Sequence, residues 1–247
     1  MIKAVLFDLD NTLYDYTTAD RIAEEALYEN VVKLIGPMDR EEFARQYKIA
    51  KTEIKRELRG TASSHNRALY IQRFLEIHNV SFDPEIILKL YDCYWDKLLE
   101  VMQPLEGLIP VLRELQEMGV KIGIVTNLTA HIQLRKIKKL QIQEFIDILV
   151  TSEETGTEKP HSAMFLVAAN KLGVLPTQCM FVGDNIDSDT EGANAVGMKT
   201  VCIFFGEHAT QVASEGAEEP NFTVWRLSEI IGIVKRLNDS TEAQKSC

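Results

Sequence analysis

The stretch Ile2–Thr12, IKAVLFDLDNT, decides the fold of this chain. The run Ile2–Phe7 is mostly apolar and includes β-branched and aromatic residues, which is typical of a buried central strand. Asp8 and Asp10 follow at once, where the chain should turn out of a sheet. A carboxylate beside an apolar core costs several kcal/mol unless its charge is neutralised, and two close together cost more. The spacing therefore predicts a cation site at the end of the first strand.

Four more apolar runs have the length and composition of central strands. They cover residues 121–125, 147–150, 179–182 and 200–204. Helical patterns precede or separate them at 109–118, 130–140, 162–172 and 190–196. This alternation predicts an α/β fold, in which a parallel, Rossmann-like sheet with right-handed crossovers is flanked by helices.

A long helical insert interrupts this alternation. Residues from about 17 to 102 carry no comparable strand pattern, and their apolar residues recur at helical spacing. We expect a four-helix domain over 15–103, inserted into a core formed by 1–14 and 104–237. Joined to the core by two adjacent tethers, such a domain can open and close over the end of the first strand. The polar segment 238–247 is predicted to be a disordered tail.

Composition limits the possible partners and compartment. The 247 residues carry a net charge of −10, which argues against a nucleic-acid-binding or anionic-membrane-binding protein. The four cysteines form no CxxC pair, so a reducing cytoplasm is expected. The first apolar run is too short for a signal peptide, and no window has the length of a membrane span. We expect a cytoplasmic protein that acts on small molecules, as a monomer or a homodimer.

Polar residues follow four of the five predicted strands. Besides Asp8 and Asp10, these are the pair Thr126-Asn127, the segment Glu158–Pro160 and the run Gly183–Asp189. In an open parallel sheet, ligands bind at the carboxyl ends of the strands, where the strand order reverses. All four groups should lie at that edge. Their order along the chain is a stronger signal than any one of them alone.

The set Asp8-x-Asp10-x-Thr12, Thr126, Lys159 and Gly183-Asp184, with Asp189 five residues on, resembles the haloacid dehalogenase superfamily. The resemblance spans nearly the whole chain. The helical insert is similar to the cap domain of the phosphatase branch of that superfamily. The resemblance implies the strand order 3-2-1-4-5, which would place strands one and four side by side.

Chemistry and resemblance together suggest catalytic roles at this edge. Asp8 is expected to attack phosphorus and form an aspartyl-phosphate. Asp10 is expected to protonate the leaving oxygen and then deprotonate the attacking water. The expected cofactor is Mg²⁺, held by the Asp8 and Asp184 carboxylates and by the backbone carbonyl of Asp10.

The remaining residues of the set are expected to bind the phosphoryl group. Thr126 and the backbone amides near Asn127, at a helix N-terminus, suit a phosphoryl oxygen. Lys159 supplies a positive charge for the phosphoryl group and for Asp8. Asp189 should orient the site, and Asp187 is interpreted as a turn residue.

The sequence therefore predicts a magnesium-dependent phosphatase for a small phosphorylated metabolite. Asp10 argues against carbon–halogen cleavage, because a halide needs no proton and the superfamily's dehalogenases lack this second aspartate. A sugar phosphomutase and a regulatory module that binds phosphorylated ligands without turnover remain alternatives. Nucleoside monophosphates, acyl-sugar phosphates and phosphoglycolate are candidate substrates. Many relatives have glycine where this chain has Leu128, directly after the Thr-Asn pair.

Overall fold

The computed structural model describes residues 1–205 and 219–245, and the chain divides into two compact units. The core unit consists of Met1–Asp15 and Gln103–Cys247, and the helical unit is the segment Tyr16–Met102 between them. Each junction lies one residue from the boundary expected from the sequence. No helix in the described part of the chain is long and apolar enough to cross a membrane.

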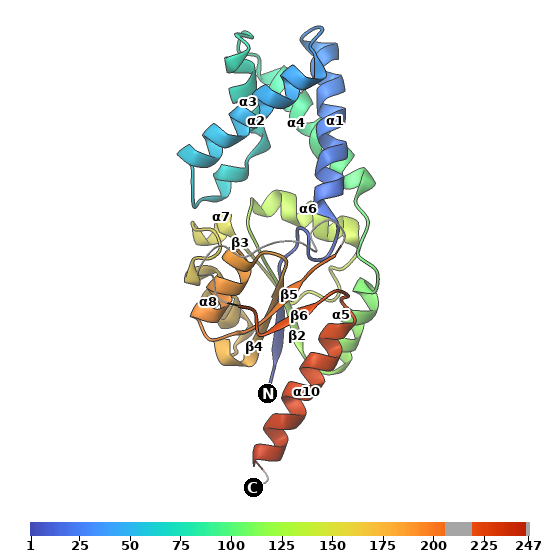
Figure 1. The fold of residues 1–247 in the computed structure, drawn as a ribbon, viewed down its shortest axis with the longest axis vertical. Coiled ribbons are helices and arrows are strands. Elements are labelled where there is room, and N and C mark those ends of the chain that lie inside the picture. Colours follow the sequence, from blue (N-terminus) through green and yellow to red (C-terminus); the bar gives the residue numbers. More distant parts are fainter. Residues whose placement is uncertain (206–218, 246–247) are drawn as a thin grey trace. The chain divides into compact units, whose positions relative to one another are not determined.

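The core unit is built on a parallel sheet with the order β3-β2-β1-β4-β5-β6 (Figure 1). The strands are β1 (Ala4–Phe7), β2 (Lys121–Thr126), β3 (Ile148–Thr151), β4 (Cys179–Gly183), β5 (Lys199–Ile203) and β6 (Phe222–Val224). The predicted order 3-2-1-4-5 is confirmed, and β6 adds an edge strand that the sequence did not predict. Because β6 has only three residues, its apolar pattern is too short to distinguish from a loop.

Strand β1 lies in the middle of the sheet, between β2 and β4. Phe7, its last residue, lies opposite Ile124 of β2 and Val182 of β4. The backbone N–H of Asp8 extends this pairing by donating to the Val182 carbonyl at 2.9 Å. The residues that follow β1 and β4 therefore leave the sheet side by side, at the edge where parallel sheets bind ligands.

Helices cover the two faces of the sheet. They are α5 (Leu108–Glu117), α6 (Ala130–Leu140), α7 (Ser152–Thr155), α8 (Ser162–Leu172), α9 (Glu191–Ala195) and α10 (Glu229–Lys245), with a 3₁₀ turn η2 (Pro176–Gln178) and a π-helical turn η3 (Ile186–Thr190). Ala4 and Leu6 belong to the same buried cluster as Met164 and Phe165 of α8. Because side chains alternate along a strand, Val5 and Phe7 point to the opposite face, and all of β1 is buried.

The segment from Asn238 onward, predicted from sequence to be a disordered tail, is helical up to Lys245 as part of α10. The helix continues to Lys245, whereas residues 246–247 lie outside the described part of the chain. Asn238 ties the helix to the start of the sheet, because its Oδ1 accepts from the Ile2 N–H at 2.6 Å and its Nδ2 donates to the Ile2 carbonyl at 3.3 Å. Composition gives no sign of this tertiary contact, which explains the difference.

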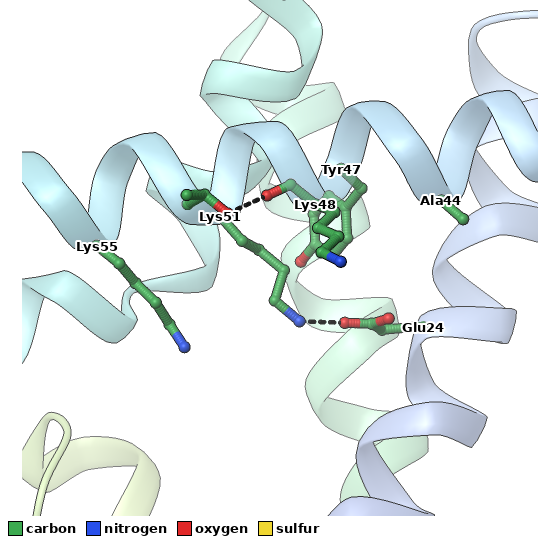
Figure 2. A pocket seen from close by; sticks show the side chains of 7 residues that line it. Glu24, Ala44, Tyr47, Lys48, Lys51 and Lys55 are labelled. Atoms are coloured by element: carbon green, nitrogen blue, oxygen red, sulfur yellow. Dashed lines mark hydrogen bonds and ion pairs between the residues drawn. The ribbon is translucent and has the colours of Figure 1, made fainter. Parts of the chain in front are cut away.

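The helical unit contains α1 (Tyr16–Leu34), α2 (Arg40–Glu57), the 3₁₀ turn η1 (Ala62–His65), α3 (Arg67–Ile77) and α4 (Pro84–Val101). Asp39 and Asp83 cap α2 and α4, and each accepts two backbone N–H bonds with its side chain. Helix α1 packs on α4 and α2 packs on α3, around a buried cluster that includes Tyr47 and Phe74. Lys51 of α2 pairs with Glu24 and so joins α2 to α1 (Figure 2).

Candidate active site

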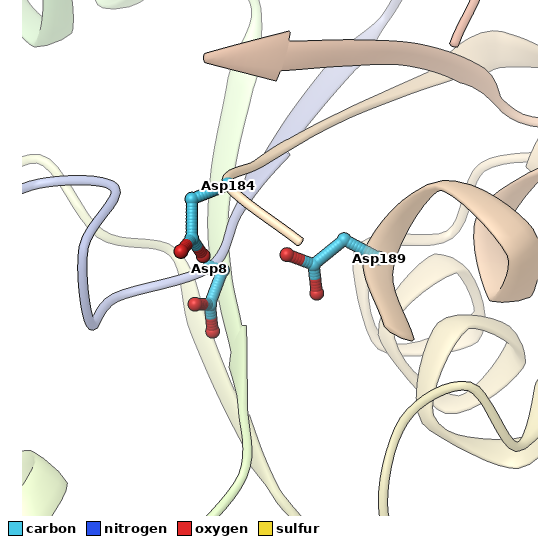
Figure 3. A group of neighbouring side chains, drawn as sticks. All are labelled: Asp8, Asp184 and Asp189. Carbon is cyan, nitrogen blue, oxygen red and sulfur yellow. The ribbon is translucent and has the colours of Figure 1, made fainter. Parts of the chain in front are cut away.

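Three buried aspartates meet at the carboxyl edge of the central strands (Figure 3). Asp8 directly follows β1, Asp184 directly follows β4, and Asp189 lies in η3. One carboxylate oxygen of each lies within 4.8 Å of one from each of the other two. The arrangement brings together three of the acidic residues singled out from the sequence. Asp187 lies in the same π-helical turn but is exposed.

Local backbone structure directs Asp189 back toward the sheet. Its N–H donates to the Asn185 carbonyl at 2.8 Å, and its Oδ2 accepts from the Asn185 N–H at 3.1 Å. Gly183 leaves the space for this carboxylate, since a Cβ there would overlap the Asp189 side chain. The glycine in the sequence run is therefore a requirement of packing against Asp189.

Lys159 joins two members of the cluster. Its ammonium donates to Asp8 Oδ1 at 2.6 Å and to Asp189 Oδ1 at 2.7 Å, and its side chain is 3% exposed. Burial disfavours the lysine charge, but the charges of Asp189 and Asp8 outweigh burial and raise the pKa of Lys159 above its ordinary value. The ammonium is thus a fixed positive charge beside Asp8.

The cluster carries more negative charge than Lys159 alone compensates. Burial raises the pKa of Asp8 to about 6, although Lys159 acts in the opposite direction. Burial, followed by the charges of Asp189 and Asp8, raises the pKa of Asp184 to about 9. Without a cation, Asp184 therefore keeps its proton at neutral pH. Carboxylate oxygens are the ligands that Mg²⁺ prefers, so the donor set of Asp8 and Asp184 fits a hard divalent cation.

The Asp10 carboxylate has partners of its own. Lys136 of α6 donates to both of its oxygens at 2.7 Å, and the Tyr14 hydroxyl donates to Oδ1 at 2.7 Å. The Lys136 side chain is fully buried, and its ammonium lies 5.9 Å from the centre of the Tyr14 ring. This role of Lys136 could not be predicted from sequence, because a lysine in the basic stretch of α6 is typical of a solvated helix face.

Thr126 is the last residue of β2, and Asn127, which follows it, contacts Lys159. Asn127 Oδ1 accepts from the Lys159 backbone N–H at 3.0 Å. Gln133, a second residue whose role could not be predicted from sequence, donates from Nε2 to Thr126 Oγ1 and to the Asn127 carbonyl, both at 2.8 Å. These contacts fix the turn that leads from β2 into α6.

Leu128 continues that turn in a conformation that favours glycine. Its φ of 97° lies in the left-handed region, where a branched side chain is strained. The side chain is buried, and the Leu128 N–H donates to Ser152 Oγ at 2.9 Å. The turn thus holds a leucine in a backbone conformation that glycine adopts without strain.

The sequence matches a family model described as haloacid dehalogenase-like hydrolase over residues 2–197. A ribulose-1,5-bisphosphate 5-phosphatase from Halopiger xanaduensis is 43% identical over 238 residues, which cover 95% of this chain and 100% of the relative. A glyceraldehyde 3-phosphate phosphatase from Methanopyrus kandleri is 34% identical and covers 96% of this chain and 99% of its own length.

Solved structures show the same fold. A HAD phosphatase from Thermococcus onnurineus superposes with a TM-score of 0.68 at 25% identity, covering 94% of this chain and 98% of its own. A 2-haloacid dehalogenase from Pseudomonas syringae pv. Tomato superposes with a TM-score of 0.75 at 23% identity, covering 96% and 100%. At that identity, the second likeness is one of fold alone.

Proposed function

The chain belongs to the haloacid dehalogenase-like hydrolase family, and from this premise we propose that it is a phosphatase that hydrolyses phosphate monoesters of small sugars. The observation that carries the proposal is the buried pair Asp8 and Asp184 with the Lys159 ammonium 2.6 Å from Asp8. The two relatives named above are both phosphatases, and each aligns over more than nine-tenths of this chain.

Asp8 is the proposed nucleophile. One of its carboxylate oxygens forms a bond to phosphorus while the bond from phosphorus to the sugar oxygen breaks, which leaves an aspartyl-phosphate. Lys159 balances the charge of Asp8 and of the phosphoryl oxygens during this displacement. Thr126 and the backbone amides near Asn127 complete the proposed phosphoryl site.

A magnesium ion is the proposed cofactor. Asp8, Asp184 and the Asp10 backbone carbonyl would hold it, and Asp189 would remain bonded to Lys159. When bound, the ion supplies positive charge that reduces the repulsion between the carboxylate and the phosphate dianion.

Asp10 is the proposed proton carrier. Its carboxyl group gives a proton to the leaving sugar oxygen in the first step. In the second step it takes a proton from the water that attacks phosphorus, and the bond from phosphorus to Asp8 breaks. Lys136 and Tyr14 hold the Asp10 side chain in one orientation for both transfers.

Sugar phosphates are the proposed substrates because two relatives act, by name, on ribulose 1,5-bisphosphate and glyceraldehyde 3-phosphate. A phosphoglycolate phosphatase from Xanthomonas campestris is 30% identical over 207 residues, so phosphoglycolate, a candidate from the sequence, stays a second proposed substrate. The phosphatase names of these relatives favour hydrolysis over the phosphomutase alternative.

A screen of phosphate esters tests the proposal. We expect phosphate release from sugar phosphates and p-nitrophenyl phosphate with magnesium, no release with EDTA, and no turnover by Asp8→Asn. The matched control is Asp187→Asn, which changes an exposed aspartate of the same turn as Asp189 and should keep activity. Release that persists in EDTA, or in Asp8→Asn, contradicts the mechanism.

A further inference from the structure

A hollow of about 390 Å³ opens within the helical unit, between α1 and α2. Glu24 of α1 and a set of α2 residues line it, including Tyr47, Lys48, Lys51 and Lys55. In Figure 2 the side chains of Tyr47, Lys48 and Lys51 extend from α2 to the same side, and Lys51 meets Glu24 there. The residues that build this hollow all belong to the helical unit, whereas the aspartate cluster belongs to the core unit.

The hollow is positively charged in a chain whose net charge is −10. Lys48, Lys51 and Lys55 are spaced three and four residues apart, so they share one face of α2. Like charges at this spacing repel one another, and Lys51 pairs with Glu24 and lies 4.0 Å from Asp20. Lys48 makes no ion pair with any residue in 1–205 or 219–245. With three lysines and one glutamate, the lining carries more positive than negative side chains, and a bound anion would balance them.

The Tyr47 hydroxyl gives a second, independent indication of a ligand. The side chain is 2% exposed, and within the described residues its oxygen has no hydrogen-bond partner. The ring is held by packing on Phe43 and Phe74, so the hydroxyl has a fixed position. Burial raises the pKa of Tyr47, so the hydroxyl keeps its proton and can donate to an anion. A buried hydroxyl without a hydrogen-bond partner costs free energy, and we infer that a ligand supplies the missing partner.

We propose that this hollow is an anion-binding site that takes a phosphate group, bound by the ammonium groups of Lys48, Lys51 and Lys55 and by the Tyr47 hydroxyl. Lysine ammoniums bind phosphate as point charges, and a neutral hydroxyl donor adds direction. The phosphate has two possible sources, the second phosphate of a bisphosphorylated sugar substrate or a separate phosphorylated metabolite. The first source rests on the proposed phosphatase function, and the second does not.

A binding experiment tests the site itself. Isothermal titration of the full chain with inorganic phosphate is carried out in EDTA, with wild type, Lys48→Gln/Lys55→Gln, Tyr47→Phe and the control Lys33→Gln. Lys33 lies in the last turn of α1, does not line the hollow and gives the same change of charge as one of the two substitutions. We expect the Kd to rise about tenfold or more in the double variant and about threefold in Tyr47→Phe, with Lys33→Gln unchanged.

A kinetic experiment separates the two sources. KM is compared for ribulose 1,5-bisphosphate and for glyceraldehyde 3-phosphate, with p-nitrophenyl phosphate turnover as the measure of an intact catalytic site. If the phosphate belongs to the substrate, the double variant raises KM for the bisphosphate about tenfold more than KM for the monophosphate. If the phosphate belongs to a separate metabolite, the KM ratio stays constant while phosphate binding in EDTA is weakened.

The binding and kinetic experiments together can refute the proposed anion site. Two results together contradict the proposed anion site. Wild type does not bind phosphate in EDTA, or all variants bind it equally, and the KM ratio is unchanged. Failure of wild type to hydrolyse p-nitrophenyl phosphate would instead refute the phosphatase function and leave the binding arm valid. Thermal unfolding without phosphate checks the fold. The double variant should unfold at about the same temperature as wild type, because both replaced side chains are exposed.

Discussion

The Lys136 ammonium lies 2.7 Å from each carboxylate oxygen of Asp10, although the two residues are 126 positions apart in the sequence. The Lys136 side chain is fully buried, and it contacts the Asp10 carboxylate and the Tyr14 ring. The pair restricts the Asp10 carboxylate to one orientation. In the proposed reaction, Lys136 is thus a positioning residue for the group that moves the proton.

Replacing Lys136 by methionine should lower kcat. The substitution keeps the unbranched apolar part of the side chain but removes the ammonium, so Asp10 loses its fixed orientation. We expect kcat to fall about tenfold to a hundredfold, since loss of positioning should remove only part of the roughly 10²–10⁴-fold contribution of general acid–base catalysis, and KM to change little. Steady-state kinetics on a sugar phosphate measures both constants. Lys138→Met, at an exposed position of the same helix, is the control, and an unchanged kcat in Lys136→Met refutes the positioning role.

Replacing Lys159 by methionine should destabilise the fold. The change leaves Asp8 and Asp189 buried without their shared cation, and breaking a buried pair in this way costs about 3–5 kcal/mol. The loss should be smaller near pH 5 than near pH 8, because protonation of Asp8, whose pKa burial raises to about 6, removes one of the two unpaired charges. Chemical denaturation at the two pH values measures this difference. Lys171→Met removes a partly exposed pair with Glu154 and should cost less than about 1 kcal/mol at both.

Replacing Gly183 by alanine should displace Asp189. The added Cβ would overlap the Asp189 carboxylate, so this side chain must move away from Lys159. We expect phosphatase activity to fall about tenfold or more, since small displacements in a catalytic site have large effects. Gly232→Ala in α10 is the matched control, because nothing lies within 4 Å of its Cβ position. A Gly183→Ala enzyme with full activity would show that the Asp189 contact with Lys159 is dispensable.

Magnesium affinity should rise with pH through Asp184. The pKa of Asp184 is raised to about 9, so the metal-free protein keeps a proton that the ion must displace. The dissociation constant should fall about tenfold per pH unit between about pH 6, the raised pKa of Asp8, and about pH 9, that of Asp184. Titration calorimetry in buffers of different ionisation enthalpy measures the proton released. Asp184→Asn should abolish the pH dependence together with tight binding, whereas affinity that is independent of pH contradicts the raised pKa.

The same shift affects the stability of the metal-free protein. Because the folded state binds the Asp184 proton more tightly than the unfolded state, this group stabilises the fold fully below its ordinary pKa of 3.8. That contribution is lost as the pH rises toward about 9. We therefore expect the free energy of unfolding in EDTA to decrease with pH across this range, and added magnesium to reduce the decrease.

Much of the core unit could be predicted from sequence, because each element there carries a local pattern. The runs near β1 and β4 are apolar and buried, and the helices 130–140 and 162–172 have the predicted bounds. Asp8, Asp184 and Asp189 could be grouped because parallel strands bring their carboxyl ends to one edge.

Other parts depend on contacts between residues far apart, which local pattern does not contain. Lys136 gains its role only from Asp10 on another element, and Asn238 orders the end of α10 only through Ile2. The hollow lined by Tyr47 requires α1 and α2 to pack, which periodicity does not specify.

Covalent labelling of Asp8 tests the central claim most directly. The enzyme is mixed with a sugar phosphate that carries a radioactive phosphoryl group, quenched in acid during turnover, digested and analysed by mass spectrometry. The account predicts label on the peptide that contains Asp8, and none in Asp8→Asn. Turnover of the labelled ester by wild type with no phosphate on Asp8 at any quench time, or labelling at another residue, would contradict it.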